Sequence, residues 1–573
     1  MISKSHRVVT TLIKFTLESL TQFGALVSLA AFILVFTDFA MIHWLGLAEK
    51  FPRLIWIHFI QTWIFCYLLS LCFSKKTFFI WNAILFSFSF LQWLCLSYYG
   101  SYLSPMMIFL FFRDIAEVIE SSKGAGQQLV KPIVMGFLGV ILLRWLTLLK
   151  YEKNISGLSL ISKRVLKVLI FFTILYPIPR TFFTGHTFGK QAKVQELSLV
   201  NFYGAFSYFF GRILPAKAKA AIMSNSNEKS NFNEKLVPRS IVELNPQRHV
   251  VFILGESLGL RHLQLFGYHE ETTPQLLSLY QQNKLLIRSG VSGGVSTDVS
   301  IPMLIQDAFG PSAASMVASQ EHCLFKLAKK NGFQTSFISV QTQENLQHIT
   351  NFFCNTYLDF YKAGDNSNTI NGESTALDEE LLAEAKKISW KQPQFVIFHQ
   401  RGSHSPYESR YPSNHAFRVI NKNDPWELQL KKHYDNSVHY TDQNIKDLVE
   451  WIQMNSTLPV EVIFTSDHGE ALGETQQWGH VILHPVVAEV PVLYFPENET
   501  FRAVFKKQKN WVNHHFVSSF LISLLGYGLE SSFEDGTNQI LNQNHFVMGA
   551  DLDGLGGFMK VIPHENELVR LPE

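Results

Sequence analysis

The first third of the chain is a series of apolar segments long enough to cross a membrane. They are rich in Phe, Leu, Ile and Trp and lie near residues 21–46, 54–74, 77–99, 132–149 and 166–186. A helix of about 20 apolar residues crosses the hydrocarbon core of a bilayer. The first segment is too long for a signal peptide, and no small-residue cleavage site follows it. The sequence therefore predicts an N-terminal domain of five transmembrane helices over residues 1–186.

The basic residues in the loops predict how these helices are oriented. Lys75 and Lys76 follow the second segment, and Lys163 and Arg164 precede the fifth. Loops on the cytoplasmic side carry the excess of Lys and Arg. We therefore expect a cytoplasmic N-terminus and, after five crossings, a C-terminal half on the outer face. In a bacterium this places the soluble half in the periplasm, anchored to the inner membrane.

The segments around the last span combine apolar and polar residues. Met106 to Phe112 is too short to span, so we expect an interfacial or re-entrant element there, or a plain loop helix. Asp38 is expected at an interface. Residues 202–214 are aromatic and predict a helix in the bilayer interface, whereas 222–236 predict a flexible connection. Together they suggest a linker over 187–245.

Composition separates the two parts of the chain and limits the partners. The mean hydropathy of +0.09 averages an apolar third with a soluble remainder. A net charge of +2 gives no reason to expect a nucleic-acid partner. Of the five cysteines, only Cys323 and Cys354 lie outside the apolar segments, so only they have the opportunity to pair.

From His249 onward, strand patterns alternate with helix patterns. A face of apolar and aromatic residues steps by three and four from Tyr434 to Ile452 and predicts a helix. Short β-branched runs predict buried strands at 250–254, 336–339, 395–398, 462–464 and 492–495. This alternation predicts a doubly wound α/β domain over residues 246–573.

Polar residues follow several of these strands. In open α/β sheets, chemistry takes place where the strands end. Gly255-Glu256-Ser257 follows one strand and Asp467-His468 another. The remaining candidates are Thr297 in a Gly-Ser loop, His399 and His404 after a third strand, and His480.

The pattern Gly255-Glu256-Ser257-Leu258-Gly259 is also compatible with the nucleophile elbow of a serine hydrolase. In that interpretation Ser257 attacks an ester, with Asp467 and a later histidine completing a triad. However, Asp467 and His468 are adjacent, whereas the acid and base of a triad normally come from separate loops. The hydrolase interpretation also leaves Thr297 without a role.

A metal site would give a role to more of these candidate residues. Two carboxylates (Glu256, Asp467), one imidazole (His468) and the hydroxyl of Thr297 make a plausible tetrahedral zinc site. Zinc would lower the pKa of the threonine hydroxyl and make it a nucleophile. The other three histidines would then bind a phosphoryl oxygen, carry a proton or hold a second ion.

These residues resemble the membrane-anchored phosphoethanolamine transferases of the alkaline phosphatase and sulfatase superfamily. The resemblance covers the five spans, the linker and the soluble domain, and the last of its motifs is highly specific. The matching motifs are Gly255-Glu256-Ser257 with Phe266-Gly267-Tyr268, Thr297-Asp-Val-Ser-Ile-Pro302, His399 to Pro406, Tyr434-Asp435-Asn436, and Asp467-His-Gly-Glu-Ala-Leu-Gly-Glu474 followed by His480.

The resemblance implies an enzyme that works by ping-pong phosphoryl transfer. It implies zinc ligands at Glu256, Thr297, Asp467 and His468, with one zinc site expected and a second possible. His404 and His480 are implied as catalytic residues that bind phosphate or a second ion, with His399 as a weaker candidate. Thr297 is implied to take phosphoethanolamine from phosphatidylethanolamine and pass it to lipopolysaccharide, on a lipid A phosphate or a core sugar. We expect a monomer.

Two departures from the family leave the acceptor open. Members that modify lipid A often have a cysteine pair flanking the nucleophile loop, where this chain has Gly293 and Met303. Several also bind the head group through Ser and Lys, and residues 341–345 contain no such pair.

Two alternatives share the architecture. A glycerophosphate transferase of the lipoteichoic acid synthase type would use phosphatidylglycerol and typically manganese. A catalytically inactive lipid sensor would be expected to have lost ligands, and none of the four is missing. A sulfatase is disfavoured because no Cys or Ser occupies a Cys/Ser-x-Pro-x-Arg element.

Overall fold

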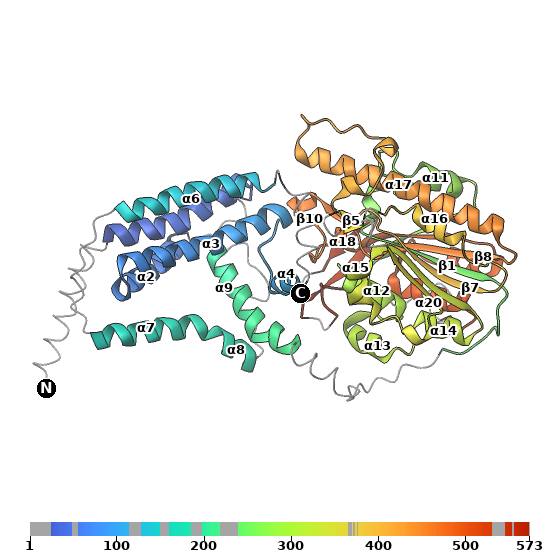
Figure 1. Ribbon diagram of the computed structural model, residues 1–573, viewed down its shortest axis with the longest axis horizontal. Coiled ribbons are helices and arrows are strands. Elements are labelled where there is room, and N and C mark those ends of the chain that lie inside the picture. The colour runs from blue at the N-terminus through green and yellow to red at the C-terminus, as the bar shows by residue number, and fades with distance from the viewer. Residues whose placement is uncertain are drawn as a thin grey trace, which may run out of the picture. The chain divides into compact units, whose positions relative to one another are not determined.

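The computed structural model divides into two compact units, which are described separately. One comprises Met1–Ile115 with Ala125–Glu228 and is helical; the other comprises Ala116–Gly124 with Lys229–Glu573 and is α/β (Figure 1). The residues described are 24–47, 55–113, 126, 128–148, 160–184, 197–217, 239–364, 369–370, 373–374, 376–529, 545–552 and 555–571. The predicted flexible connection at 222–236 lies outside them.

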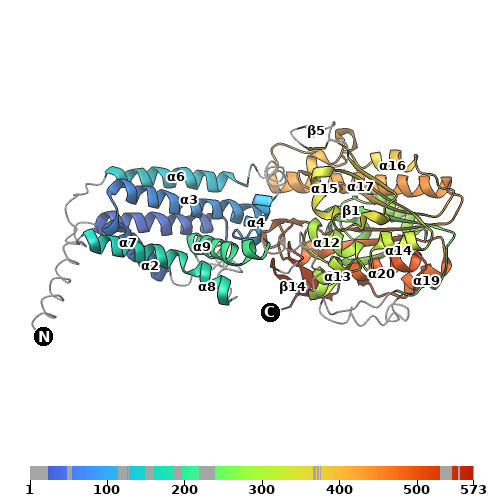
Figure 2. The ribbon, with the colours of Figure 1, turned by 60° about the horizontal axis from the view of Figure 1, so that its bottom comes forward.

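Among the described residues of the first unit, four helices are long and apolar enough to cross a membrane, as predicted for the first four segments. They are Gly24–Trp44, α2 (Ile55–Cys72), α3 (Lys75–Tyr99) and α6 (Val130–Leu148). Helices α3 and α6 pack side by side (Figure 2). A Cβ on Gly139 of α6 would lie 1.9 Å from the ring of Phe86. Glycine at this position therefore permits the close approach of the two helices.

The fifth predicted span is bent rather than continuous. Residues 160–184 form α7 (Leu160–Leu175) and α8 (Pro177–Thr184), which meet at an angle of 41°. Pro177 has no N–H to donate, and its ring clashes with the preceding turn of a continuing helix. The segment predicted near 166–186 therefore contains a bend at this proline. Counted as one bent span, α7 and α8 bring the unit to five.

Asp38 is buried among the helices of the first unit. Its carboxylate accepts hydrogen bonds from Nε1 of Trp93, at 2.6 Å, and from the backbone N–H of Ser198, at 2.8 Å. It thereby ties the first span to the start of the predicted aromatic helix. The described part of this unit also contains α4 (Pro105–Arg113), α9 (Ser198–Tyr208) and a π-helix (Phe209–Ile213).

The second unit is built on an eight-stranded sheet in the order β12-β2-β11-β8-β1-β7-β3-β4. All five predicted strands are present in it, and β2, β4 and β12 were not predicted. The strands are β1 (His249–Gly255), β2 (Leu286–Val291), β3 (Gln334–Thr342), β4 (Phe360–Gly364), β7 (Gln394–His399), β8 (Val460–Ser466), β11 (Glu489–Phe495) and β12 (Trp511–Asn513).

Helices cover both faces of the sheet (Figures 1 and 2). One layer contains α11 (Pro274–Gln281), α16 (Glu380–Ala385) and α17 (Trp426–Asn455). The opposite layer contains α12 (Thr297–Ile305), α13 (Ala313–Ser319), α14 (Leu324–Lys330), α15 (Gln343–Thr350), α19 (Glu499–Lys507) and α20 (His514–Leu524). Smaller elements are α18 (Pro485–Ala488), β5 (Thr369–Ile370), β6 (Glu373–Ser374), β9 (Ala471–Leu472), β10 (Trp478–Gly479), β13 (His545–Met548), β14 (Phe558–His564) and β15 (Glu567–Arg570).

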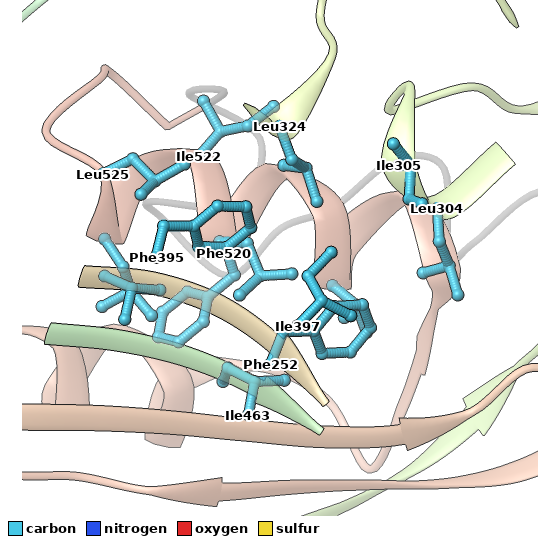
Figure 3. Close-up of a cluster of buried hydrophobic side chains, with 14 of the residues drawn as sticks. Phe252, Leu304, Ile305, Leu324, Phe395, Ile397, Ile463, Phe520, Ile522 and Leu525 are labelled. Carbon is cyan, nitrogen blue, oxygen red and sulfur yellow. The ribbon is translucent and has the colours of Figure 1, made fainter. Parts of the chain in front are cut away.

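The alternation of side chains along β1 explains why the strand is apolar throughout. Phe252 packs with Phe395, Ile397 and Phe520 beneath α20, as Figure 3 shows. The neighbouring Val251 and Ile253 belong to the core on the other face, under α17. Successive side chains of a strand point to opposite faces, so a strand covered on both sides needs an unbroken apolar run.

The directions of the strands bring the candidate residues to one edge. β1 runs parallel to both β7 and β8. β11 runs antiparallel to β8 and to β2, so β2 points the same way as β8. The sheet is therefore mixed, and β1, β2, β7 and β8 all end at the same edge. Cys323 and Cys354 form a disulfide.

Candidate metal and nucleophile site

The structure brings the four predicted metal ligands together at that edge. Glu256 follows β1, Asp467 and His468 follow β8, and Thr297 begins α12. The hydroxyl of Thr297 donates to Oε1 of Glu256 at 2.9 Å and lies 3.4 Å from Nε2 of His468. Nε2 of His468 also lies 3.3 Å from Oδ2 of Asp467. These four side chains form one compact group.

The group has the ligand composition of a metal site, and one of its described carboxylate oxygens lacks a hydrogen-bond donor. Ligand atoms of Glu256, Asp467 and His468 all lie within 4.8 Å of one another, and all three residues are buried. Among the residues that the structure describes, Oδ2 of Asp467 has no hydrogen-bond donor. Two buried carboxylates this close need a neutralising cation. Oxygen and imidazole donors in this number fit zinc.

The pKa shifts of the two carboxylates also favour a bound cation. Burial and the adjacent charge of Glu256 raise the pKa of Asp467. Burial acts in the same direction on Glu256, but hydrogen bonding and the nearby imidazoles hold its pKa below the usual range. One of the two carboxylates is thus poorly compensated by protein groups alone, and a cation between them would remove that imbalance.

The positions of the protons on two histidines follow from their Nδ1 partners. Nδ1 of His468 lies 2.9 Å from the carbonyl of Gly469, and Nδ1 of His404 lies 2.6 Å from the carbonyl of Ser405. A carbonyl only accepts, so each Nδ1 carries a proton, and in the neutral ring Nε2 is then the nitrogen with a free lone pair. In His468 that nitrogen faces Glu256 and Thr297. This is the arrangement that orients a histidine ligand toward a metal.

His404 and His480 lie beside the ligand group on the His468 side. The ring of His480 stacks on that of His468 with centroids 4.5 Å apart, and the ring of His404 is 5.2 Å from His480. His399 lies on the other side, with Nε2 at 3.7 Å from Oε2 of Glu256. All seven predicted site residues therefore belong to one cluster.

The sequence interpretation missed Glu470 and Tyr407. Oε2 of Glu470 lies 2.9 Å from Nδ1 of His480, and its Oε1 accepts from the hydroxyl of Tyr407 at 2.7 Å. Glu470 stands in the Asp-His-Gly-Glu motif, which was a usable signal, whereas Tyr407 offered none. Glu470, His468 and His480 also form a second group of possible ligands. Because Nδ1 of His480 is already at hydrogen-bond distance, we interpret Glu470 as the residue that orients His480.

Gln341, at the end of β3, is another residue without an assigned role in the sequence interpretation. Its Nε2 lies 3.2 Å from Oε2 of Glu256 and 3.2 Å from the carbonyl of Gln400, so it donates toward both. It lies in the stretch 341–345, which corresponds to the expected head-group site. In this structure it holds the outer oxygen of Glu256, and with it the orientation of that carboxylate.

The geometry does not favour Ser257 as a nucleophile. Ser257 is fully buried, and its hydroxyl lies 3.5 Å from Oε1 of Glu256. Its backbone N–H donates to Oδ1 of Asp467 at 3.1 Å, which positions that carboxylate. The hydroxyl of Thr297 is only partly buried and has a carboxylate and an imidazole beside it.

The positions of Gly293 and Met303 are suited to an engineered, stabilising disulfide. A Cβ on Gly293 would lie 3.6 Å from the Cβ of Met303, a separation typical of bonded cysteines. We expect Gly293→Cys with Met303→Cys to form a disulfide and to add up to about 3 kcal/mol to the free energy of unfolding. The check is the thermal midpoint with and without reductant. A midpoint in the oxidised variant no higher than that of the reduced variant would contradict this prediction.

The chain is similar to several known proteins. The sulfatase family model matches residues 248–527. The chain is 25% identical over 305 residues to the Kdo(2)-lipid A phosphoethanolamine 7''-transferase of Escherichia coli (strain K12), covering 50% of this chain and 52% of that protein. It thus spans about half the length of that relative. To the phosphoethanolamine transferase EptA of the same strain it is 21% identical over 461 residues, covering 74% of this chain and 80% of EptA.

A solved structure resembles almost the whole chain. It is the integral membrane lipooligosaccharide phosphoethanolamine transferase A (EptA) from Neisseria meningitidis. The TM-score is 0.58 at 19% sequence identity, over 89% of this chain and 96% of that one. The shared fold therefore includes the apolar helices as well as the α/β domain.

Proposed function

We propose that the protein, whose residues 248–527 match the sulfatase family model, is a zinc-dependent transferase of phosphoethanolamine. The donor would be phosphatidylethanolamine, the acceptor lipopolysaccharide, and Thr297 the residue that carries the group between them. The observation that carries the proposal is the Thr297 hydroxyl, held 2.9 Å from Glu256 and 3.4 Å from His468 at the start of α12.

The first transfer would form a bond between Oγ1 of Thr297 and phosphorus and break the bond from phosphorus to the diacylglycerol oxygen. Glu256, Asp467, His468 and Thr297 would hold the zinc, which lowers the pKa of a hydroxyl and neutralises phosphoryl charge. Glu256 accepts the hydrogen bond of the attacking hydroxyl. The N-terminal N–H groups and the dipole of α12 favour an anionic phosphoryl group there.

The second transfer would move the phosphoethanolamine group from Thr297 to the acceptor. An acceptor oxygen attacks, the bond to Thr297 breaks, and the threonine hydroxyl is restored. Both steps need a group that gives a proton to the leaving oxygen or takes one from the attacking oxygen. We propose His404 and His480 for this role and for contact with phosphoryl oxygens, since both rings lie beside His468.

The membrane unit supports a lipid substrate. Its apolar helices would keep the α/β domain at a bilayer, where both a phospholipid donor and a lipid A acceptor reside. We propose the periplasmic face of a bacterial inner membrane, following the distribution of basic residues in the loops. The relative found in Escherichia coli is named for the same class of acceptor.

The test is the intact mass of the full-length protein in detergent after incubation with a single lipid. With phosphatidylethanolamine we expect one added phosphoethanolamine group, about 123 Da, if the covalent intermediate is long-lived. A glycerophosphate adduct from phosphatidylglycerol would instead favour the lipoteichoic acid synthase type of activity. No adduct and no transfer with either lipid would contradict the proposal.

Glu470→Gln is expected to slow transfer about 10-fold to 100-fold, the usual effect of losing a carboxylate that orients a functional histidine. The amide keeps the shape but no longer stabilises a protonated His480. The measurement is the transfer rate against pH, where we expect the rate to fall and the profile to shift.

Tyr407→Phe is the matched control for that substitution, because it removes the second hydrogen bond of Glu470 and leaves the pair with His480 intact. We expect it to cost less than Glu470→Gln. Equal losses would indicate that the loop as a whole, rather than His480, is disturbed.

A further inference from the structure

His514 begins α20 and is fully enclosed at the candidate site, although nothing in the sequence singled it out. Its Nδ1 accepts the backbone N–H of Gly293 at 3.1 Å. Its Nε2 lies 3.0 Å from the carbonyl of Ser466. Because a carbonyl only accepts, Nε2 carries the proton and Nδ1 does not. One neutral ring therefore binds two backbone atoms, one with each nitrogen.

The two backbone atoms belong to the two halves of the site. Gly293 lies in the loop that leads from β2 to Thr297, and Ser466 is the residue before Asp467. In the sheet, β11 lies between β2 and β8 and pairs with both, so β2 and β8 share no ladder hydrogen bond. The ring of His514 thus joins two strand ends that the sheet itself does not connect directly.

Burial also keeps the ring in the state that this bridge needs. It lowers the pKa of His514 to about 3, because a charged imidazole is poorly solvated there. A protonated ring would have no acceptor for the N–H of Gly293. The surrounding structure therefore maintains one tautomer in one orientation.

We propose that His514 is a positioning residue that sets the distance between the Thr297 loop and the metal-binding end of β8. Its Nδ1 would hold the nucleophile loop, and its Nε2 would hold the backbone that presents Asp467 and His468. The inference rests on the proposed function in assigning Thr297 as the nucleophile. An error in position of about 1 Å is enough to slow an oriented reaction about 100-fold.

Two substitutions separate the two contacts. The oxygen of Asn lies where Nδ1 of histidine lies, so His514→Asn keeps the acceptor for Gly293 and loses the donor to Ser466. The amide nitrogen of Gln reaches the place of Nε2, so His514→Gln keeps the donor and loses the acceptor. The measurements on full-length protein are zinc release to a chromophoric chelator and the rate of Thr297 modification by phosphatidylethanolamine at saturating zinc.

We expect opposite results from the two variants. His514→Asn should release zinc about tenfold faster or more, while Thr297 is modified nearly as in wild type. His514→Gln should retain zinc but modify Thr297 about tenfold more slowly or worse. His514→Ala should show both defects. If Asn and Gln variants behave alike in both measurements, or like wild type, the proposal is overturned.

His249 provides a matched control for loss of a buried histidine. Its Nδ1 accepts the N–H of Gln394 at 3.2 Å, and burial lowers its pKa to about 4. It lies at the start of β1, the opposite end of the strand from Glu256. His249→Asn should lower stability without changing either rate. If wild type forms no Thr297 adduct, the proposed function fails, while zinc release still tests the Ser466 contact.

Discussion

Full-length protein with Thr297→Ala is expected to form no phosphoethanolamine adduct and to lose transfer by roughly 1,000-fold or more, as knockouts of covalent nucleophiles do. The substitution removes the only hydroxyl that lies between Glu256 and His468 in the described part of the site. The other three proposed ligands remain, so zinc content should stay near that of wild type. The measurements are the intact mass, the rate of transfer to lipopolysaccharide and the bound metal.

Thr297→Ser is the control that keeps the hydroxyl nucleophile and removes only the methyl group of the side chain. A serine hydroxyl still reaches Glu256 but loses the methyl group that limits its rotamers. We expect an adduct to form with transfer reduced about 10-fold to 100-fold, since the nucleophile is less well oriented. Transfer by Thr297→Ala at a rate close to that of Thr297→Ser would show that threonine is not the carrier.

The central strands and the ligand positions were predictable because the same physical constraint produces both. β1 and β8 are buried on both faces, so they are apolar throughout, and a carboxylate directly after them marks the edge of the sheet. Glu256, Asp467 and His468 stand at those ends. Thr297 was found through its motif, since the short strand before its loop, β2, carries Arg288 and Ser289 and gave no strand pattern.

Hydrophobic periodicity and segment length predicted neither the direction of β11 nor the bend after α7. β11 is as apolar as its parallel neighbours, and hydrophobic periodicity says nothing about which way a strand runs. Pro177 lies inside an apolar stretch of spanning length, and the length criterion ignores the missing N–H. The direction of β11 depends on the connections between elements, whereas the bend was missed because the prediction used the length and hydropathy of the segment and not the position of its proline.

The residues that surround the ligands were missed for a different reason. Gln341, Tyr407 and His514 each act through one or two hydrogen bonds to groups that are distant in the sequence. A single polar residue in an ordinary segment carries no spacing signal. Only the fold shows that His514 faces Gly293 and Ser466.

Asp467→Asn is expected to lower zinc affinity more than about 100-fold, because it removes a charged ligand and not merely a group that orients one. Chelation of zinc from the wild-type protein should then lower the thermal midpoint, since a ligand that binds only the native state stabilises it. The variant should show little further change on chelation. Protons should compete for the site in mildly acidic solution, because the pKa of Asp467 is raised and a carboxylate must lose its proton to bind metal.

Asp442→Asn is the matched control for this substitution. Asp442 is also buried and also accepts two backbone N–H groups, from Gln275 and Leu276, but it caps α11 and contacts none of the proposed ligands. Both variants lose one buried carboxylate, so a general effect on folding should appear in both. Zinc binding and the response to chelator should change in Asp467→Asn alone. Equal zinc content in the two variants would rule out Asp467 as a ligand, and the unsatisfied Oδ2 would then need another partner.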